Sequence, residues 1–206
     1  MVRGIHSWTR GLLVALAVAA GFALLLPRGL GWLGHSLVQR DEIERSEAIL
    51  IENFAPDYLL FEKARELLMD GWAGRVLVPV QASPNGERPN AVSKGFVEVM
   101  AKEARIPEPE LIPVREVEPI TLAVAHQVRD RLLGEGVGSV LVVSPGFRSK
   151  RSALVWGSVL GRAGIRVSVV PVFGQRTPEN WRDTWHGWQE VILQFLKLLY
   201  YRLAVL

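Results

Sequence analysis

The chain has 206 residues, no cysteine and a formal net charge of +3. Without cysteine it forms neither a disulfide nor a thiolate metal site, and thiol catalysis is excluded. Residues 1–40 hold four arginines and no acid, so residues 41–206 carry 20 basic against 21 acidic side chains. This near-neutral part has the size of one ordinary domain and lacks a basic footprint, so no nucleic-acid partner is expected.

The amino-terminal part of the chain predicts a membrane anchor. Residues 11–26 form a run of sixteen without a charge, and Trp8 and Trp32 bracket it. A membrane helix needs about 20 residues and often has tryptophan at both interfaces, so the anchor is expected to cover residues 11–33 and to contact the lipid bilayer. A buried helix of a soluble protein would carry a polar face, which this run lacks.

A cleavable signal peptide is the alternative for the same segment. Its cleavage site would follow the apolar run with small residues, whereas residues 24–28 read Leu-Leu-Leu-Pro-Arg, which favours an uncleaved anchor. The arginines before the run favour a cytoplasmic amino terminus. The predicted organisation is therefore a cytoplasmic segment (1–10), a single transmembrane anchor (11–33), a tether (34–46) and an extracytoplasmic domain (47–206).

Beyond the tether, short apolar runs alternate with helical patterns. The runs suited to buried strands are Ala48–Ile51, Val76–Val80, Leu111–Val114, Val140–Val143 and Val167–Val170. The helical patterns cover Tyr58–Met69, Ala91–Ala104, Thr121–Leu133, Arg148–Arg162 and Asn180–Leu203. This order predicts a three-layer, Rossmann-like α/β domain with a mostly parallel five-stranded sheet. Ligands of such sheets bind beyond the carboxyl ends of the strands, in the loops that follow them.

The turn from Ser144 to Arg151 carries the strongest chemical signal. A strand ends in Ser-Pro-Gly and leads into a helix whose first backbone amides have no partner within the helix. Arg148, Lys150 and Arg151 lie in the first turn of that helix, where each cation weakens the helix by up to ~1 kcal/mol unless an anion is nearby. The combination predicts a site for a phosphate, carboxylate or uronate, with Ser144, Gly146 and the amides after them as its cradle.

Side chains of the neighbouring loops complete this expected site. Thr121 is expected to cap its helix and to face the same ligand, and Ser83 and Asn53 follow two other strands. Glu118 is the nearest candidate acid or base. A structural alternative remains, in which the two arginines pair with acids of the domain. The acids that could do so are Glu52, Glu116 and Glu118.

Motifs for other chemistries are missing from the sequence. The four histidines, His6, His35, His126 and His186, show no metal-ligand spacing, so no metal site is predicted. Neither Ser83 nor Ser144 lies in a Gly-x-Ser-x-Gly elbow, and the glycine-rich nucleotide-binding motifs are absent. No cofactor is predicted from these patterns.

Three tryptophans recur at helical spacing near the carboxyl terminus. Trp181, Trp185 and Trp188 are continued by Ile192, Phe195 and Leu199. Such a stripe is typical of a helix packed on a sheet. The alternative is that this last helix contacts the membrane interface or the chain's own anchor.

The motif around Ser144 resembles the strand-to-helix motif of the YdcF, SanA and ElyC-like proteins, which are bacterial envelope-linked domains with a Rossmann-like fold. Ser144 takes the place of the motif threonine, Arg151 that of the motif arginine, and Ser152 that of the small residue after it. Arg148 stands where the family usually has histidine. Over about residues 46–201, further similarities are Thr121 at a helix start, Thr177–Trp181, Glu190 and Lys197–Tyr201.

The chain also departs from this family pattern. Ile51–Phe54 and Val80–Ser83 replace turns that are usually rich in glycine, and the missing histidine removes the best general acid or base. The chain is therefore identified as a divergent member, and inherited catalysis is not predicted.

The resemblance implies a protein of the bacterial inner (plasma) membrane that acts in cell-wall or surface-polysaccharide metabolism by recognising a small anionic ligand. It leaves open a nucleoside-type ligand such as S-adenosylmethionine. The alternative is a non-catalytic binding or scaffold protein with partners in an envelope assembly.

Overall fold

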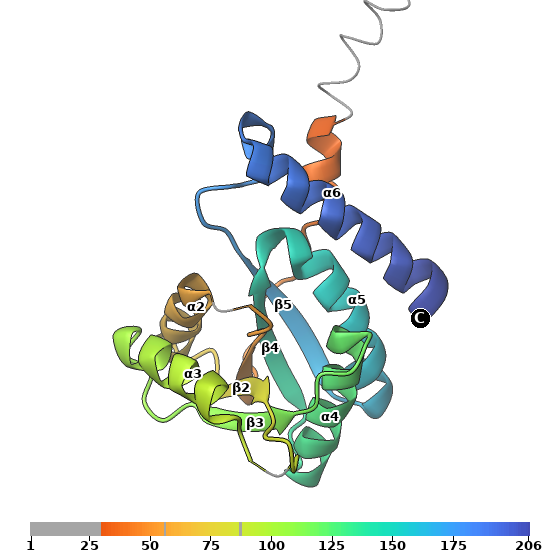
Figure 1. Cartoon of the computed structure of the whole chain (residues 1–206). Helices are drawn as coiled ribbons and strands as arrows, with labels where there is room; N and C mark the ends of the chain where they lie inside the picture. The colour runs from red at the N-terminus through yellow and green to blue at the C-terminus, as the bar shows by residue number, and fades with distance from the viewer. Residues whose placement is uncertain (1–29, 56, 87) are drawn as a thin grey trace, which may run out of the picture.

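A five-stranded, all-parallel sheet forms the centre of the domain (Figure 1). The structure, a computed structural model, describes residues 30–55, 57–86 and 88–206. The strands are β1 (Ala48–Ile51), β2 (Val76–Gln81), β3 (Glu110–Val114), β4 (Ser139–Pro145) and β5 (Arg166–Val172). Each of the five predicted strands is present, which confirms the strand assignment from apolar runs.

Helices cover both faces of this sheet. They are α2 (Tyr58–Met69), α3 (Ala91–Glu103), α4 (Ile120–Gly134), α5 (Ser149–Leu160) and α6 (Trp185–Tyr200). Figure 1 shows α2 and α3 on one side of the sheet and α4 and α5 on the other. The starts of α2, α3 and α6 are capped by the side-chain oxygens of Asp57, Asn90 and Thr184, which accept from backbone N–H groups of the first turn.

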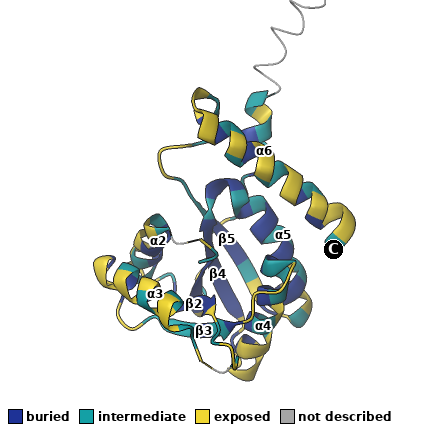
Figure 2. Ribbon diagram, viewed as in Figure 1, coloured by how far each residue is buried: buried dark blue, intermediate teal, exposed yellow. Residues whose placement is uncertain are grey.

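The two hydrophobic cores follow from the pleat of the strands. In β1, Ala48 and Leu50 pack with α4 and α5, whereas Ile49 and Ile51 pack with α2 and α3. All four are fully buried, and Figure 2 shows the strands as the buried interior of the domain. The predicted three-layer, Rossmann-like α/β architecture is thus confirmed.

The strand order is β3-β2-β1-β4-β5, so the direction of winding reverses between β1 and β4. In the parallel register Ile51 lies beside Val143, and the Glu52 amide donates to the Val143 carbonyl at 3.0 Å. The residues that follow these two strands therefore meet at one edge of the sheet. In open α/β sheets this point of reversal is where ligands bind.

The carboxyl-terminal helix forms a separate layer with the first described residues. The expected helix over Asn180–Leu203 is divided: Trp181–Asp183 form a 3-10 turn, α6 follows, and Tyr201–Val205 form a final π turn. A third hydrophobic cluster joins α6 to the rest, and its buried members are Leu37, Phe147, Trp181, Val191 and Leu198.

Only part of the predicted anchor lies in the described part of the chain. Residues 1–29 are outside it, which includes most of the span expected over 11–33, and residues 30–36 are helical. No helix within residues 30–55, 57–86 and 88–206 is both long and apolar enough to cross a membrane.

The segment expected to be a tether, residues 34–46, is bonded to the domain. The Leu37 carbonyl accepts from the Lys150 amide at 3.0 Å, and the Gln39 amide donates to Ser149 Oγ at 2.9 Å. The Asp41 carboxylate accepts from the Val169 amide at 2.9 Å and so occupies a free donor on β5, an edge strand. The domain therefore begins before residue 47, because these residues satisfy backbone donors that the sheet and α5 leave open.

Candidate functional site

A cavity of about 290 Å³ opens at the point where the winding of the sheet reverses. Its wall includes three cations, Arg148 and Arg151 from the start of α5 and Lys197 from α6. Glu118 and Thr121, which lie just before and within the first turn of α4, complete its polar lining. The structure thus brings together four of the predicted site residues and adds Lys197, which the sequence did not single out as a ligand contact.

Arg148 and Arg151 each have an N–H group without a hydrogen-bond acceptor. Arg151 is 6% exposed, and its guanidinium lies 5.5 Å from the centroid of the Tyr201 ring. The Nε atoms of Arg148 and Arg151 are buried without a hydrogen-bond partner. Within the described residues, neither arginine makes an ion pair. The alternative considered above, pairing with Glu52, Glu116 or Glu118, is therefore absent at contact distance.

The positive charges of Arg148, Arg151 and Lys197 lie close enough together in the cavity wall to repel one another. Burial lowers the pKa of Arg151, and the negative charge of Glu52 partly offsets this lowering. Loss of hydration also lowers the pKa of Lys197, and the neighbouring Arg151 and Arg148 lower it further. An anion in the cavity would relieve this repulsion and accept hydrogen bonds from charged donors of its wall, as in other charge-assisted anion sites.

Behind the cavity lies a buried network centred on Glu52. Its Oε2 accepts from Ser144 Oγ at 2.5 Å and from Ser152 Oγ at 2.6 Å, and the two hydroxyls lie 2.9 Å apart. Glu52, Ser144 and Ser152 are each 0% exposed. Ser144 was predicted to belong to the ligand cradle, but its hydroxyl faces the interior, so its place is to hold Glu52 near Arg151.

The chain itself occupies one amide of the cradle predicted at the start of α5, that of Lys150. The Lys150 amide donates to Leu37, as described above, and the Lys150 ammonium bonds to Gln39 Oε1 at 2.7 Å. Ser149 Oγ donates to the Gly146 carbonyl at 2.6 Å. The first turn of α5 thus receives its partners from residues 37–39, and the two arginine side chains remain as the anion donors.

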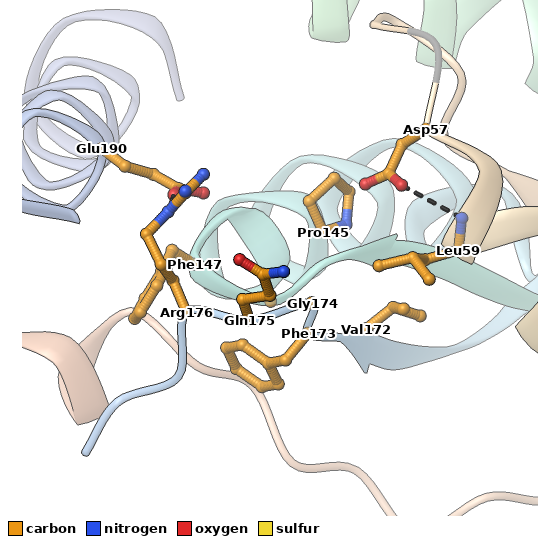
Figure 3. Close-up of a pocket in the computed structure, with 11 residues that line it drawn as sticks. Asp57, Leu59, Pro145, Phe147, Val172, Phe173, Gly174, Gln175, Arg176 and Glu190 are labelled. Atoms are coloured by element: carbon orange, nitrogen blue, oxygen red, sulfur yellow. Dashed lines mark hydrogen bonds and ion pairs between the residues drawn. The ribbon is translucent and has the colours of Figure 1, made fainter. Parts of the chain in front are cut away.

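Gly146 borders a second cavity, of about 260 Å³, on the other side of this turn (Figure 3). A Cβ atom at Gly146 would lie 2.0 Å from the Phe173 ring, so close packing requires glycine here. The charges of this cavity are already satisfied: Arg176 Nε donates to Glu190 at 2.9 Å, and Asp57 accepts from the Leu59 amide at 3.1 Å. The first cavity, called the cationic cavity below because Arg148, Arg151 and Lys197 line it, is therefore the better candidate for a ligand site.

The remaining predicted residues lie outside the wall of the cationic cavity or have another role. The capping residue of α4 is Pro119, which offers no side-chain acceptor, and the Ile120 amide donates to Glu118 Oε2 at 3.4 Å, so the prediction that Thr121 caps the helix is wrong. Asn53 Oδ1 is buried without a partner, next to Phe54 in the cavity wall. Ser83 belongs to a turn after β2, in which its amide donates to the Arg88 carbonyl at 2.7 Å.

Sequence reasoning did not foresee the contribution of α6 to the site. Lys197, Tyr200 and Tyr201 line the cavity from one face of the helix, because positions three and four apart are neighbours on a helical surface. Their spacing was visible in the sequence. Their proximity to Arg148 depends on how α6 crosses the start of α5, which the sequence pattern does not show.

Comparisons with known proteins add no relative: no family model, no curated protein and no solved structure matches the chain significantly. The fold and the site by themselves define a Rossmann-like α/β protein with a cationic cavity at the point where its sheet reverses.

Proposed function

We propose that this protein is a membrane-anchored, envelope-associated protein of the YdcF, SanA and ElyC type, which recognises a small anionic ligand in cell-wall or surface-polysaccharide metabolism. One observation supports ligand recognition above all others. Arg148, Arg151 and Lys197 line one cavity, and none of the three makes an ion pair within the described residues.

The chemistry of these groups favours a phosphate or a carboxylate. A guanidinium offers a planar set of donors that matches either anion, and an ammonium adds a point charge. Arginine remains protonated at ordinary pH and so cannot act as a base. Glu118 is the single carboxyl group in the described cavity wall and hence the candidate for proton transfer. The proposal therefore commits to binding, and Glu118 is where a test of turnover should begin.

Ligand-dependent stabilisation of the full chain in detergent tests the site. Inorganic phosphate at about 100 times its dissociation constant should raise the free energy of unfolding by about 2.7 kcal/mol. The double variant Arg148→Gln/Lys197→Gln should lose this gain, because both changes remove donors from the cavity wall. S-adenosylmethionine, tested in parallel, examines the nucleoside-type alternative.

Lys150→Gln is the matched control for this measurement. It removes a cation from the same helix turn, but that ammonium bonds to Gln39 and does not line the cavity. Phosphate should stabilise this variant as much as the unchanged protein. Equal loss in the control and the double variant, or no stabilisation by any anion, would reject the site. Absence of stabilisation by any anion is the result expected if the protein is a non-catalytic scaffold.

The envelope location is tested separately by topology reporters. A fusion after Leu206 to a reporter that is active only outside the cytoplasm should be active, because the arginines before the apolar run favour a cytoplasmic amino terminus. Activity from a reporter that functions only inside would contradict the envelope placement while leaving the anion site untouched.

A further inference from the structure

We infer that α6 lies in the interfacial region of the bilayer, with an exposed apolar stripe turned toward the lipid. This inference rests on the anchor in the proposed function. The stripe, called the α6 stripe below, consists of Trp185, Ile192, Leu196, Tyr200 and Leu203, whose exposed fractions are 71%, 45%, 57%, 53% and 82%.

The α6 stripe lies on one side of the helix because its members are separated by seven, four, four and three positions. The other side packs on the domain through Gly187, Val191 and Leu198. Single exposed apolar residues are ordinary on protein surfaces. A row from Trp185 to Leu203 is different, because at about 1.5 Å per residue it extends about 27 Å; it is interrupted once, by the exposed Gln189, and ends in the π turn that follows α6. In the ribbon of Figure 2, exposed residues recur along α6.

The short connection to the proposed anchor is the reason to infer that lipid covers the α6 stripe. Helix 30–36 packs on the cluster around α6 through Leu30 and Leu33. Only residues 27–29 separate it from the charge-free run, and four residues from Leu26 to Leu30 span at most about 14 Å. An anchored chain must therefore hold this end of the domain within about 14 Å of the hydrocarbon, that is, in or just outside the headgroup region, which is about 5–8 Å deep on each side.

The attachment of helix 30–36 to α6 is close. Gly34 lies against Trp181, and a Cβ atom at Gly34 would come within 2.5 Å of Trp181 Nε1. Trp32, on the same short helix, is 68% exposed. The described start of the chain, at Leu30, is thus fixed in position relative to α6.

The composition of the stripe also suits the interface. Tryptophan and tyrosine have an apolar body and a polar tip, and both are enriched at the level of the headgroups. The charged residues of α6 lie elsewhere: Glu190 pairs with Arg176, and Lys197 lines the cationic cavity. Tyr200 belongs both to the stripe and to the cavity wall, so the anion site would open beside the membrane surface.

Single labels on the full chain test this inference, since the protein has no cysteine of its own. Leu196→Cys and Leu203→Cys each receive an environment-sensitive fluorophore in phospholipid nanodiscs that hold one copy of the chain. The matched control is Val99→Cys on α3, where valine is 61% exposed and lies far from α6 (Figure 1). Quenching is compared between a lipid-borne nitroxide and a neutral water-soluble nitroxide.

Labels at positions 196 and 203 should be quenched by the lipid-borne nitroxide and should be severalfold less sensitive to the aqueous one than the label at position 99. Equal aqueous quenching at all three positions would overturn the inference. Protection from both quenchers would also overturn it, because it would show that the stripe contacts protein. Alkaline carbonate extraction of the same samples tests the anchor alone. If the chain resists extraction but the aqueous nitroxide quenches its labels, the anchor is supported and the interfacial position of α6 is rejected. If the chain is extracted but the lipid-borne nitroxide quenches its labels, the anchor is rejected and the interfacial position of α6 is supported.

Discussion

Replacement of Glu52 by alanine is expected to lower the free energy of unfolding by about 1–3 kcal/mol, the cost of leaving a buried polar group without its hydrogen-bond partner. The carboxyl group is 0% exposed, and its charge acts on the buried Arg151. Ser144 and Ser152 both donate to it and would lose their acceptor in the variant. The two hydroxyls could then bond only to each other and, from Ser152, to the Arg148 carbonyl at 3.3 Å.

Urea denaturation of the full chain in detergent, followed by far-UV circular dichroism, measures this loss. Glu52→Gln should be less destabilising, because the amide oxygen can still accept from the serines while the charge is gone. Glu116→Ala removes an exposed acid after β3 and should change stability by no more than about 0.5 kcal/mol. If Glu52→Ala is as mild as this control, the buried network does not support the cavity.

Replacement of Trp181 by alanine is expected to cost about 3–5 kcal/mol, as for other large aromatic side chains removed from a core. Trp181 is 0% exposed and packs edge-to-face on Trp188, with ring centroids 4.9 Å apart. It also contacts Gly34 of helix 30–36. The variant should therefore weaken the attachment of both α6 and the first described helix.

Trp185→Ala is the matched control, since Trp185 lies four positions later but is 71% exposed. In detergent it should alter the free energy of unfolding by no more than about 0.5 kcal/mol. In nanodiscs the same change should increase the access of the aqueous quencher to a label at position 196. A large loss of stability from Trp185→Ala in detergent would contradict the assignment of this residue to an exposed face.

The strands and helices were predictable because their signals are local. Buried parallel strands read as short apolar runs, and the runs at Ala48–Ile51 and Val76–Val80 coincide closely with β1 and β2. The division of the last helix at Thr184 was not foreseen. There the backbone turns so that Trp181 enters the core, and a Cβ atom at Gly187 would lie only 1.9 Å from the Trp181 carbonyl oxygen.

Part of the candidate site could also be predicted. Arg148, Arg151, Thr121 and Glu118 follow strands whose carboxyl ends meet at one edge, and the structure places all four around one cavity. The inward orientation of Ser144 was not predictable, because it depends on the register that sets Glu52 beside it. The occupation of the Lys150 amide by Leu37 depends likewise on a contact distant in sequence.

By itself, the sequence determined the alternation of strands and helices, the mostly parallel sheet that follows from it, and the gathering of cations at the start of α5. Periodicity and composition act over a few neighbouring residues, so they can be read without knowledge of the fold. Only the tertiary structure decided which cations face a cavity and which are bonded elsewhere: Arg148 and Arg151 turn toward Lys197, whereas Lys150 turns toward Gln39. It also decided that Trp181 is buried while Trp185 remains exposed, because the packing of α6 against helix 30–36 joins residues about 150 positions apart, a separation at which periodicity carries no information.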